Sequence, residues 1–279
     1  MLDWLTHRQA RWDQAEVTRA ASRDIFDSID GAELVTDPYP HLVVENALPA
    51  KLADALLAGM PALEVFTRNQ PPGDNVRFAL PSRIALADSR ASESWKAALR
   101  RCNAALPSLL AHFVRRFRGD LLKTFPDFAS RFAPPEDLRA VPRGKWLQRR
   151  DEVGMDAQMV VNSPALTGGN SVRGPHLDAP DKLISGLLYL RPHHDDSTGG
   201  ELQLYAPITE RIHFCGTNAA FPGHVRPVRT YPYRHNRLIL PLATPAAVHG
   251  VSPRSATAHP RYHLHLVGQL SSPLFQIPR

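Results

Sequence analysis

The stretch Gly174-Pro175-His176-Leu177-Asp178 places an imidazole and a carboxylate two residues apart. Side chains two residues apart in an extended segment point to the same side, so His176 and Asp178 can meet one metal ion. A third ligand, His249, follows 73 residues after His176. Two imidazoles and one carboxylate on one face form the facial triad that suits non-heme Fe(II) and leaves three coordination positions open. His-x-Asp is also common by chance, and the pair fits a hydrogen-bonded structural contact as well.

The pattern of apolar and turn residues changes at Asp156, before this stretch. From there onward, short apolar runs alternate with Gly-Gly and Pro turns, which is typical of an antiparallel sandwich or barrel. The expected strands are Ala157–Val161, Leu183–Leu190, Glu201–Tyr205, Val225–Thr230, Arg237–Leu240, Ala246–His249 and Arg261–Leu266.

The preceding half of the chain has mainly helical patterns. The apolar run His41–Val44 follows a Pro-rich breaker and predicts one strand. Helices are expected over Trp4–Phe26, over Ala50–Gly59, from an N-cap at Ser92 to Leu106, and from Pro107 to Leu121, before a surface connection at Pro126–Arg150. We therefore expect an α+β fold, in which residues 1–150 form a mainly helical support region with a strand near 41–44. Residues 151–279 form the sheet-rich core of the same integrated domain.

The run Arg261-Tyr262-His263-Leu264-His265-Leu266 alternates as a strand should. Arg261, His263 and His265 then share one face, which is unusual in a core unless that face lines a polar site. A buried guanidinium needs an anionic partner, and a dicarboxylate would supply one. The alternative is an edge strand whose polar face lies in water.

Together these residues resemble the Fe(II)/2-oxoglutarate-dependent dioxygenases, and within them the prolyl-4-hydroxylase-like branch. The resemblance covers roughly Asp156 to Gly268, and Pro38–Pro49 also looks like the opening strand and helix of these enzymes. Its ordered parts are His176-x-Asp178, the strand ending in Leu188-Tyr189-Leu190, Thr198–Leu202, Asn236–Leu240, His249-Gly250-Val251 and Arg261.

The resemblance implies a double-stranded β-helix, the jelly-roll fold of cupin-like proteins, in the C-terminal half. It implies that His176, Asp178 and His249 bind Fe(II), that Arg261 forms a salt bridge with the distal carboxylate of 2-oxoglutarate, and that Tyr189 hydrogen-bonds the same carboxylate. The cosubstrates would be 2-oxoglutarate and O2, with ascorbate as a reductant. Related halogenases carry a small residue in place of the carboxylate ligand, so the presence of Asp178 favours hydroxylation.

Several positions depart from the family pattern or have a second interpretation. Ser163 stands where many relatives have a tyrosine, which leaves the partner for the other end of 2-oxoglutarate open. The gap between His249 and Arg261 is longer than usual, which makes Arg254 a competitor for the cosubstrate role. Tyr189 also fits a plain core aromatic. Two interpretations are open for Arg173, Arg191, His193 and His194. These residues either contact the substrate at the pocket mouth or are solvated residues of surface loops.

Composition limits the function classes. The net charge of +6 is spread along the chain, so nucleic-acid binding gains little support. The chain has no run of about eighteen apolar residues and its first residues are charged, so we expect no membrane span, no signal peptide and a soluble, cytoplasmic protein. Two cysteines, Cys102 and Cys215, are too few for a Cys-based zinc site. Ten of the thirteen histidines follow Gly174, which places the chemistry in that half.

The sequence therefore predicts a dioxygenase that hydroxylates an unactivated C–H bond of a small-molecule or peptidyl substrate and releases succinate and CO2. It predicts no particular oligomeric state. One alternative is a non-oxidative, metal-dependent hydrolase or isomerase of the cupin type, which would use the same ligands without Arg261. Another is a degenerate barrel that acts only as a binding module.

Overall fold

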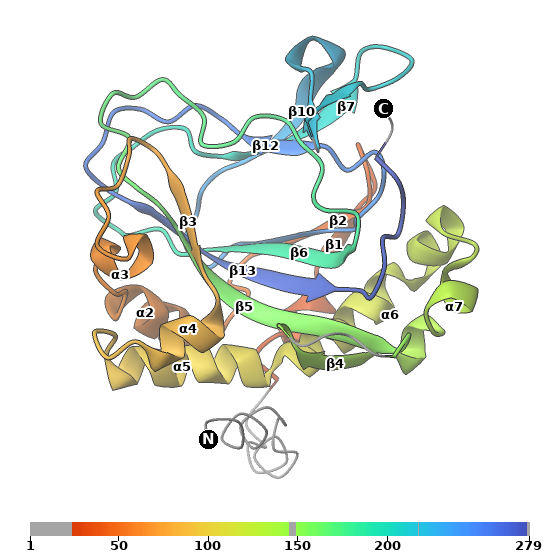
Figure 1. Cartoon of the computed structure of the whole chain (residues 1–279), viewed down its shortest axis with the longest axis horizontal. Coiled ribbons are helices and arrows are strands. Elements are labelled where there is room, and N and C mark those ends of the chain that lie inside the picture. Colours follow the sequence, from red (N-terminus) through yellow and green to blue (C-terminus); the bar gives the residue numbers. More distant parts are fainter. Residues whose placement is uncertain (1–23, 145–148, 217, 278–279) are drawn as a thin grey trace, which may run out of the picture.

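The structure, a computed structural model, describes residues 24–144, 149–216 and 218–277. Within these ranges the chain forms three layers, which can be followed in Figure 1. Most of the helices cover one face of a large sheet, and a smaller sheet lies over the opposite face. The α+β class predicted from the sequence is confirmed.

The large sheet consists of β1 (Glu33–Val35), β2 (His41–Val44), β3 (Arg77–Leu80), β4 (Arg139–Pro142), β5 (Glu152–Asn162), β6 (Lys182–Tyr189), β11 (Leu238–Pro241) and β13 (Arg261–Gln269). Its order is β1-β2-β11-β6-β13-β5-β3, and β4 pairs with β5 as well. The pairs along this order are antiparallel, whereas β4 runs parallel to β5. Strands β1 to β4 precede residue 150, so the two parts of the chain share one sheet.

The small sheet consists of β7 (Leu202–Pro207), β10 (Val225–Tyr231) and β12 (His249–Val251), in the order β10-β7-β12. A short ladder joins β8 (Phe214–Cys215) to β9 (Ala219–Ala220). His176 forms isolated bridges to His249 and to Ala219. The segment around His176 therefore continues the small sheet beyond β12.

The helical layer consists of α2 (Ala50–Ala58), α3 (Leu63–Thr67), α4 (Ser82–Ala87), α5 (Glu93–Ala104), α6 (Leu106–Thr124) and α7 (Phe128–Arg131), with short 3-10 turns at Asp27–Ile29, Pro135–Asp137 and Pro222–His224. Ser92 caps α5 as predicted, because its Oγ accepts a hydrogen bond from the Trp95 N–H. Pro107 lies in the first turn of α6, where its missing N–H has no helical partner to lose. None of the helices among the described residues is long and apolar enough to cross a membrane.

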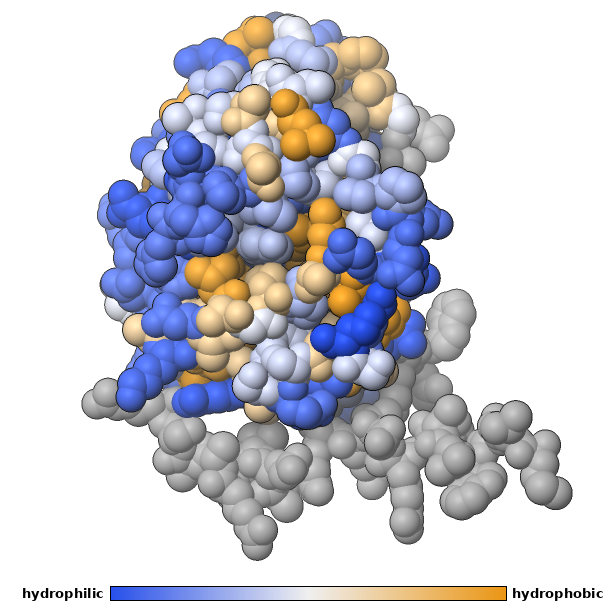
Figure 2. Space-filling view, turned by 90° about the vertical axis from the view of Figure 1, so that its left-hand side faces the viewer, coloured by the Kyte–Doolittle hydropathy of each residue, from blue (hydrophilic) through white to orange (hydrophobic). Residues whose placement is uncertain are grey.

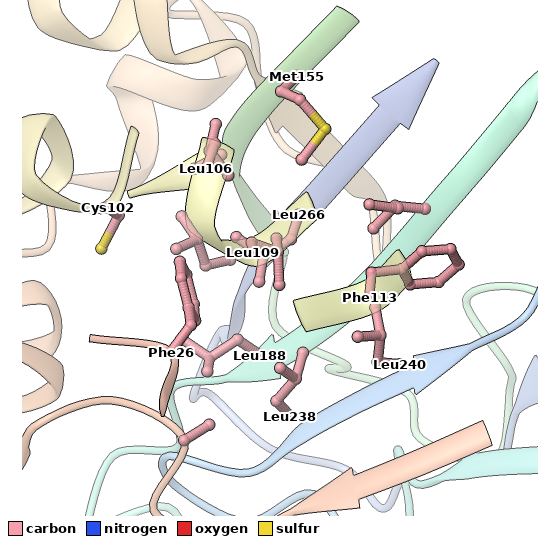
Figure 3. Packing of buried hydrophobic residues seen from close by; sticks show 14 of the residues in the cluster. Phe26, Cys102, Leu106, Leu109, Phe113, Met155, Leu188, Leu238, Leu240 and Leu266 are labelled. Atoms are coloured by element: carbon pink, nitrogen blue, oxygen red, sulfur yellow. The ribbon is translucent and has the colours of Figure 1, made fainter. Parts of the chain in front are cut away.

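Strict alternation along the central strands divides the core in two. Leu238, Leu240 and Leu266 lie with Phe113 of α6 in the cluster between helices and sheet (Figure 3). Ile239, between the two leucines of β11, belongs to the cluster between the two sheets. The same alternation on β13 directs Arg261, His263 and His265 away from the helices, toward the small sheet.

The sequence predicts the strands of the second half closely, with one clear error. The predicted strand Ala246–His249 is wrong, because β12 begins only at His249. Thr244 starts a turn that Ala246 and Ala247 complete: the Ala246 N–H donates to Thr244 Oγ1 and the Ala247 N–H donates to the Thr244 carbonyl. These hydrogen bonds to Thr244 override the strand conformation that the apolar residues before His249 suggest.

Two expectations for the first half change as well. Pro126–Arg150 is not a plain surface connection, because it contains α7 and β4, and β4 is hydrogen-bonded beside β5. The helix expected over Trp4–Phe26 falls almost wholly outside the described residues. Strand β2 and helices α2, α5 and α6 occupy the ranges that the sequence predicts.

Candidate metal centre

The structure brings His176, Asp178 and His249 together. One ligand atom from each residue lies within 4.8 Å of the others. His176 and His249 face each other across the end of the small sheet, where each backbone N–H donates to the other residue's carbonyl oxygen at 2.8 Å and 3.0 Å. Gly250 allows this close approach, because a Cβ there would lie 2.9 Å from the Gly174 carbonyl carbon. The backbone therefore places both imidazoles on one side before any metal is considered.

Backbone carbonyls fix the tautomer of both histidines. The Nδ1–H of His176 donates to the Gly174 carbonyl at 2.8 Å, and that of His249 donates to the Ala247 carbonyl at 3.0 Å. Each ring thus keeps its Nε2 lone pair for a metal. Burial, aided by the neighbouring His249 and Arg173, lowers the pKa of His176 to about 2. Protons therefore do not compete for this ligand near neutral pH.

Asp178 is the anionic member of the cluster. Burial alone would raise the pKa of this carboxyl, but the nearby charges of His249 and Lys182 hold the pKa well below its usual range. Lys182 Nζ donates to Asp178 Oδ1 at 2.9 Å, while Oδ2 lies 3.6 Å from His249 Nε2. One carboxylate oxygen is thus anchored by the lysine and the other faces the imidazoles.

A hollow of about 490 Å³ adjoins the three residues. Its walls come from the inner faces of both sheets and from the segment before His176. The polar residues that line it are Arg77, Asn162, Arg173, His176, Asp178, Ser185, His249, Arg261, His263 and His265. The three candidate metal ligands thus share one hollow with Arg77, Arg173 and Arg261.

Arg261 lies in the wall of this hollow with no anionic partner. Its side chain is 2% exposed, and no acidic group in the described part of the chain forms an ion pair with it. Its Nε atom and the Oη atom of Tyr189 are buried without a hydrogen-bond partner. The guanidinium carbon lies 4.9 Å from the ring centres of both Tyr189 and Tyr233. The expected alternative of an edge strand in water is wrong, because β13 lies between β5 and β6.

Tyr189 is a core aromatic that packs against the guanidinium of Arg261. It is fully buried and packs edge-on against Tyr233, with ring centres 5.3 Å apart. Burial raises the pKa of its hydroxyl, although Arg261 opposes that shift. The phenol therefore stays protonated and can donate a hydrogen bond beside Arg261.

Arg254, the competitor for the cosubstrate role, is already engaged. Its guanidinium contacts Asp195 Oδ2 at 2.9 Å, Ser197 Oγ at 3.0 Å and the His259 carbonyl at 2.8 Å. Gly199 permits the tight turn beside it, since φ is +76° and a Cβ would lie 1.9 Å from the Pro253 carbonyl oxygen. Arg254 is thus the centre of a buried structural network that engages all three of its side-chain nitrogens.

The remaining sequence candidates separate into pocket and surface. Arg173 lines the hollow. Arg191 instead donates to the carbonyls of Tyr233, Asp195 and Ser197, which makes it structural. His193 and His194 do not line this hollow, and their rings contact those of His235 and His259.

The sequence points to Ser163 but not to its neighbour Asn162, which lines the hollow together with Arg77. Ser163 donates to the Gly73 carbonyl and accepts from the Val76 N–H, so it is a structural residue. Its neighbour Asn162 faces the hollow, where its Oδ1 atom is buried and without a partner. Asn162 is paired in register with Arg261 on one side and with Arg77 on the other. The alternation of side chains between the two faces of β5 could have identified Asn162, whereas Arg77 belongs to a strand that the sequence does not predict.

Comparisons with known proteins give distant structural matches only. No protein-family model and no curated protein matches the sequence. A prolyl hydroxylase from Trichoplax adhaerens, solved with a hypoxia-inducible-factor peptide, is 14% identical, with a TM-score of 0.47 and 94% of each chain covered.

Two further solved structures give similar values. A Pseudomonas putida prolyl-4-hydroxylase is 13% identical, with a TM-score of 0.44 over 89% of this chain and 98% of that one. A dioxygenase for auxin oxidation from Arabidopsis thaliana, in complex with 2-oxoglutarate, is 13% identical, with a TM-score of 0.46 over 88% of both chains. At this level of similarity, the argument for function rests on the residues of the pocket.

Proposed function

We propose that this protein is an Fe(II)- and 2-oxoglutarate-dependent dioxygenase that hydroxylates a C–H bond of a small-molecule or peptidyl substrate. In this proposal the two facing sheets are the double-stranded β-helix of such enzymes. The observation that carries it is the buried Arg261, which has no acidic partner among the described residues and lies in the wall of the same hollow as the His176, Asp178 and His249 cluster, with Tyr189 packed against its guanidinium.

The donor set suits Fe(II). His176 and His249 each offer an Nε2 atom, and Asp178 offers one carboxylate oxygen. Two imidazoles and a carboxylate on one side leave positions for a chelating cosubstrate and O2. Bound iron would supply the oxidising chemistry in which 2-oxoglutarate is converted to succinate and CO2 while a substrate C–H bond is hydroxylated, with ascorbate as an external reductant.

Arg261 and Tyr189 suit the distal carboxylate of 2-oxoglutarate. A guanidinium that is 2% exposed and has no counter-ion is costly to bury. A carboxylate ligand offsets that cost, because it can accept two parallel hydrogen bonds from the guanidinium and a third from the tyrosine hydroxyl. Asn162 offers an amide beside Arg261 for a further contact with the cosubstrate.

The cupin-type hydrolase or isomerase would use the same three ligands, but it gives Arg261 and Tyr189 no role. A binding module has no need for the converging metal ligands. The dioxygenase accounts for both groups of residues, and we therefore favour it.

The test is an anaerobic titration of the iron-loaded protein with 2-oxoglutarate. A bidentate chelate of 2-oxoglutarate on Fe(II) gives a weak visible charge-transfer band, which neither alternative produces. The Arg261→Ala variant should need far more 2-oxoglutarate for the same band, whereas Arg234→Ala, a control arginine with a 62% exposed side chain, should not. Absence of the band, of O2 uptake and of succinate in the wild type, with ascorbate present, would overturn the proposal.

A further inference from the structure

Two more arginines face the hollow beside the metal ligands. Arg77 begins β3, and Arg173 lies three residues before His176. In the described part of the chain neither guanidinium forms an ion pair or a hydrogen bond with a protein group. Unlike Arg191 and Arg254, which hold loops in place, these two guanidinium groups make no such structural contact among the described residues.

The charges in the hollow are unbalanced. Burial lowers the pKa of Arg77, with Arg173 and Arg261 adding to the shift and Asp178 opposing it. Asp178 is the only acidic residue among those that line the hollow, and it already pairs with Lys182. Fe(II) and the 2-oxoglutarate dianion carry equal and opposite charges, so the proposed cofactors would not neutralise the arginines. The site is therefore short of negative charge.

The other walls of the hollow are apolar. Val172, Leu187, Leu202 and Val251 line it together with the arginines. A ligand that fills the space thus meets cationic donors and hydrocarbon. On the side of the molecule that carries β3, hydrophobic residues form several small patches among hydrophilic ones (Figure 2).

We propose that Arg77 and Arg173 bind the oxyanion of the primary substrate, which is an organic carboxylate or phosphate ester with an apolar carbon body. This inference rests on the proposed function and names its substrate class. Two guanidinium groups bind an oxyanion through paired, charge-assisted hydrogen bonds, which fix the position of the attached carbon chain. The anchored body then lies against Val172, Leu202 and Val251, with a C–H bond near the metal position.

The test measures binding and does not depend on turnover. Full-length protein carrying Mn(II) and saturating 2-oxoglutarate is titrated by calorimetry with phenylacetate or phenyl phosphate, and with their neutral counterparts phenylacetamide and phenol. We expect at least one anion to bind about tenfold or more tightly than its neutral counterpart. Arg77→Ala and Arg173→Ala should each lower the affinity for that anion about tenfold or more. The preferred anion distinguishes a carboxylate from a phosphate site.

Controls separate this inference from the proposed function. The affinity for 2-oxoglutarate should change less than about threefold in both variants, and Arg234→Ala should change neither affinity. Both variants should also melt no lower than the wild type, because each loses a cation that is unpaired and repelled by its neighbours. A lower melting temperature with unchanged anion binding would show a structural role and overturn the inference.

Three further outcomes overturn it. One is that the neutral probes bind as tightly as the anions, and another is that the anion affinity is unchanged by both substitutions. The third is that the variants lose affinity for 2-oxoglutarate and keep their affinity for the anion. That result would place Arg77 and Arg173 in the cosubstrate site and would leave the proposed dioxygenase function intact. Failure of the wild type to bind 2-oxoglutarate with Mn(II) present would instead refute the proposed function itself.

Discussion

His176 and His249 exchange both of their backbone hydrogen bonds, and their rings lie 4.4 Å apart. Residues paired in this way across antiparallel strands project to the same side of the sheet. The two imidazoles are therefore aligned by main-chain geometry, and Asp178, two residues along, joins them from the same strand-like segment. The centre is built by the sheet and does not need a metal to assemble it.

The first prediction follows from this preorganisation. His176→Ala and His249→Ala should each abolish turnover and stoichiometric iron binding, and Asp178→Ala should abolish turnover, while circular dichroism and gel filtration stay close to wild type. His259→Ala, a control at a half-exposed histidine outside the hollow, should retain both properties. Near wild-type activity in any of the three variants would show that the residue is not a ligand.

The second prediction concerns the cosubstrate. Removing one partner of a buried charge pair costs about 3–5 kcal/mol, so Arg261→Ala should raise the 2-oxoglutarate requirement by two or more orders of magnitude. Tyr189→Phe removes one hydrogen bond to a charged group and should raise it about tenfold. The measurement is the KM for 2-oxoglutarate in succinate formation. An unchanged KM in Arg261→Ala would remove this residue from the cosubstrate site.

The third prediction distinguishes Arg254 from Arg261. Arg254→Ala leaves Asp195, whose side chain is 0% exposed, without its 2.9 Å partner. The free energy of unfolding should fall by about 3 kcal/mol, the low end of the range for a broken buried pair, because Arg191 Nε remains 3.9 Å from Asp195 Oδ2 as a weaker counter-charge. Urea denaturation measures this loss, and the KM for 2-oxoglutarate of the remaining folded enzyme should be unchanged. The opposite pattern, a stable protein with a raised KM, would restore Arg254 as the cosubstrate residue.

Sequence reasoning reaches the centre because its signals are local. His176-x-Asp178 needs only the two-residue period of an extended chain, and the alternation of β13 separates Arg261 from its leucine neighbours. Asn162 and Arg77 are harder to find, because only the pairing of β3, β5 and β13 brings them beside Arg261. Pairing between distant segments leaves no periodic trace in the sequence.

The same reason explains the missed β4 and the misplaced β12. The run Arg139–Pro142 has too little apolar content to predict a strand, and its partner β5 stabilises it. The run before His249 is apolar enough to predict one, but its backbone hydrogen bonds go to the turn at Thr244. Tertiary pairing and local turn chemistry override propensity in both places.

The fourth prediction concerns stability at low pH. The ring nitrogens of His112 lie 2.7 Å from Asp24 Oδ2 and 2.8 Å from Asp30 Oδ1. Burial would raise the pKa of Asp24, but hydrogen bonds from Ser108, the Phe26 N–H and His112 lower it below its ordinary value of 3.8. The hydrogen bond with His112 lowers the pKa of Asp30 as well.

Because both folded-state pKa values are depressed, the stability they contribute is complete above about pH 4 and is lost as the pH falls through the folded values. Urea denaturation between about pH 5 and 3 should therefore show a falling free energy of unfolding. His112→Gln should flatten this dependence, whereas the control His259→Gln should keep it. An equally steep fall in His112→Gln would show that the two carboxylates do not depend on this histidine.

The fifth prediction uses Asp178 to separate hydroxylation from the non-oxidative alternatives. Asp178→Gly opens one coordination position and removes one negative charge, while Lys182, which lies 2.9 Å from that carboxylate, stays in place. Both changes favour binding of an external anion at the vacated position. The variant should lose hydroxylation yet still bind Fe(II) and 2-oxoglutarate. Azide or chloride should then shift the visible band under anaerobic conditions, and formate should partly restore turnover.

Asp196→Gly is the matched control, because the Asp196 side chain is 89% exposed and the loss of its charge leaves the centre unchanged. It should show the wild-type band with no azide-dependent shift beyond that of the wild type. A hydrolase or isomerase would show no visible band and no O2 uptake in either form. Full hydroxylation by Asp178→Gly without formate would mean that the carboxylate is dispensable, and the triad would have to be reassigned. Since Lys182 remains beside the vacated position, Asp178→Gly/Lys182→Met should bind azide more weakly than Asp178→Gly alone, which measures how much of the anion affinity comes from that ammonium group.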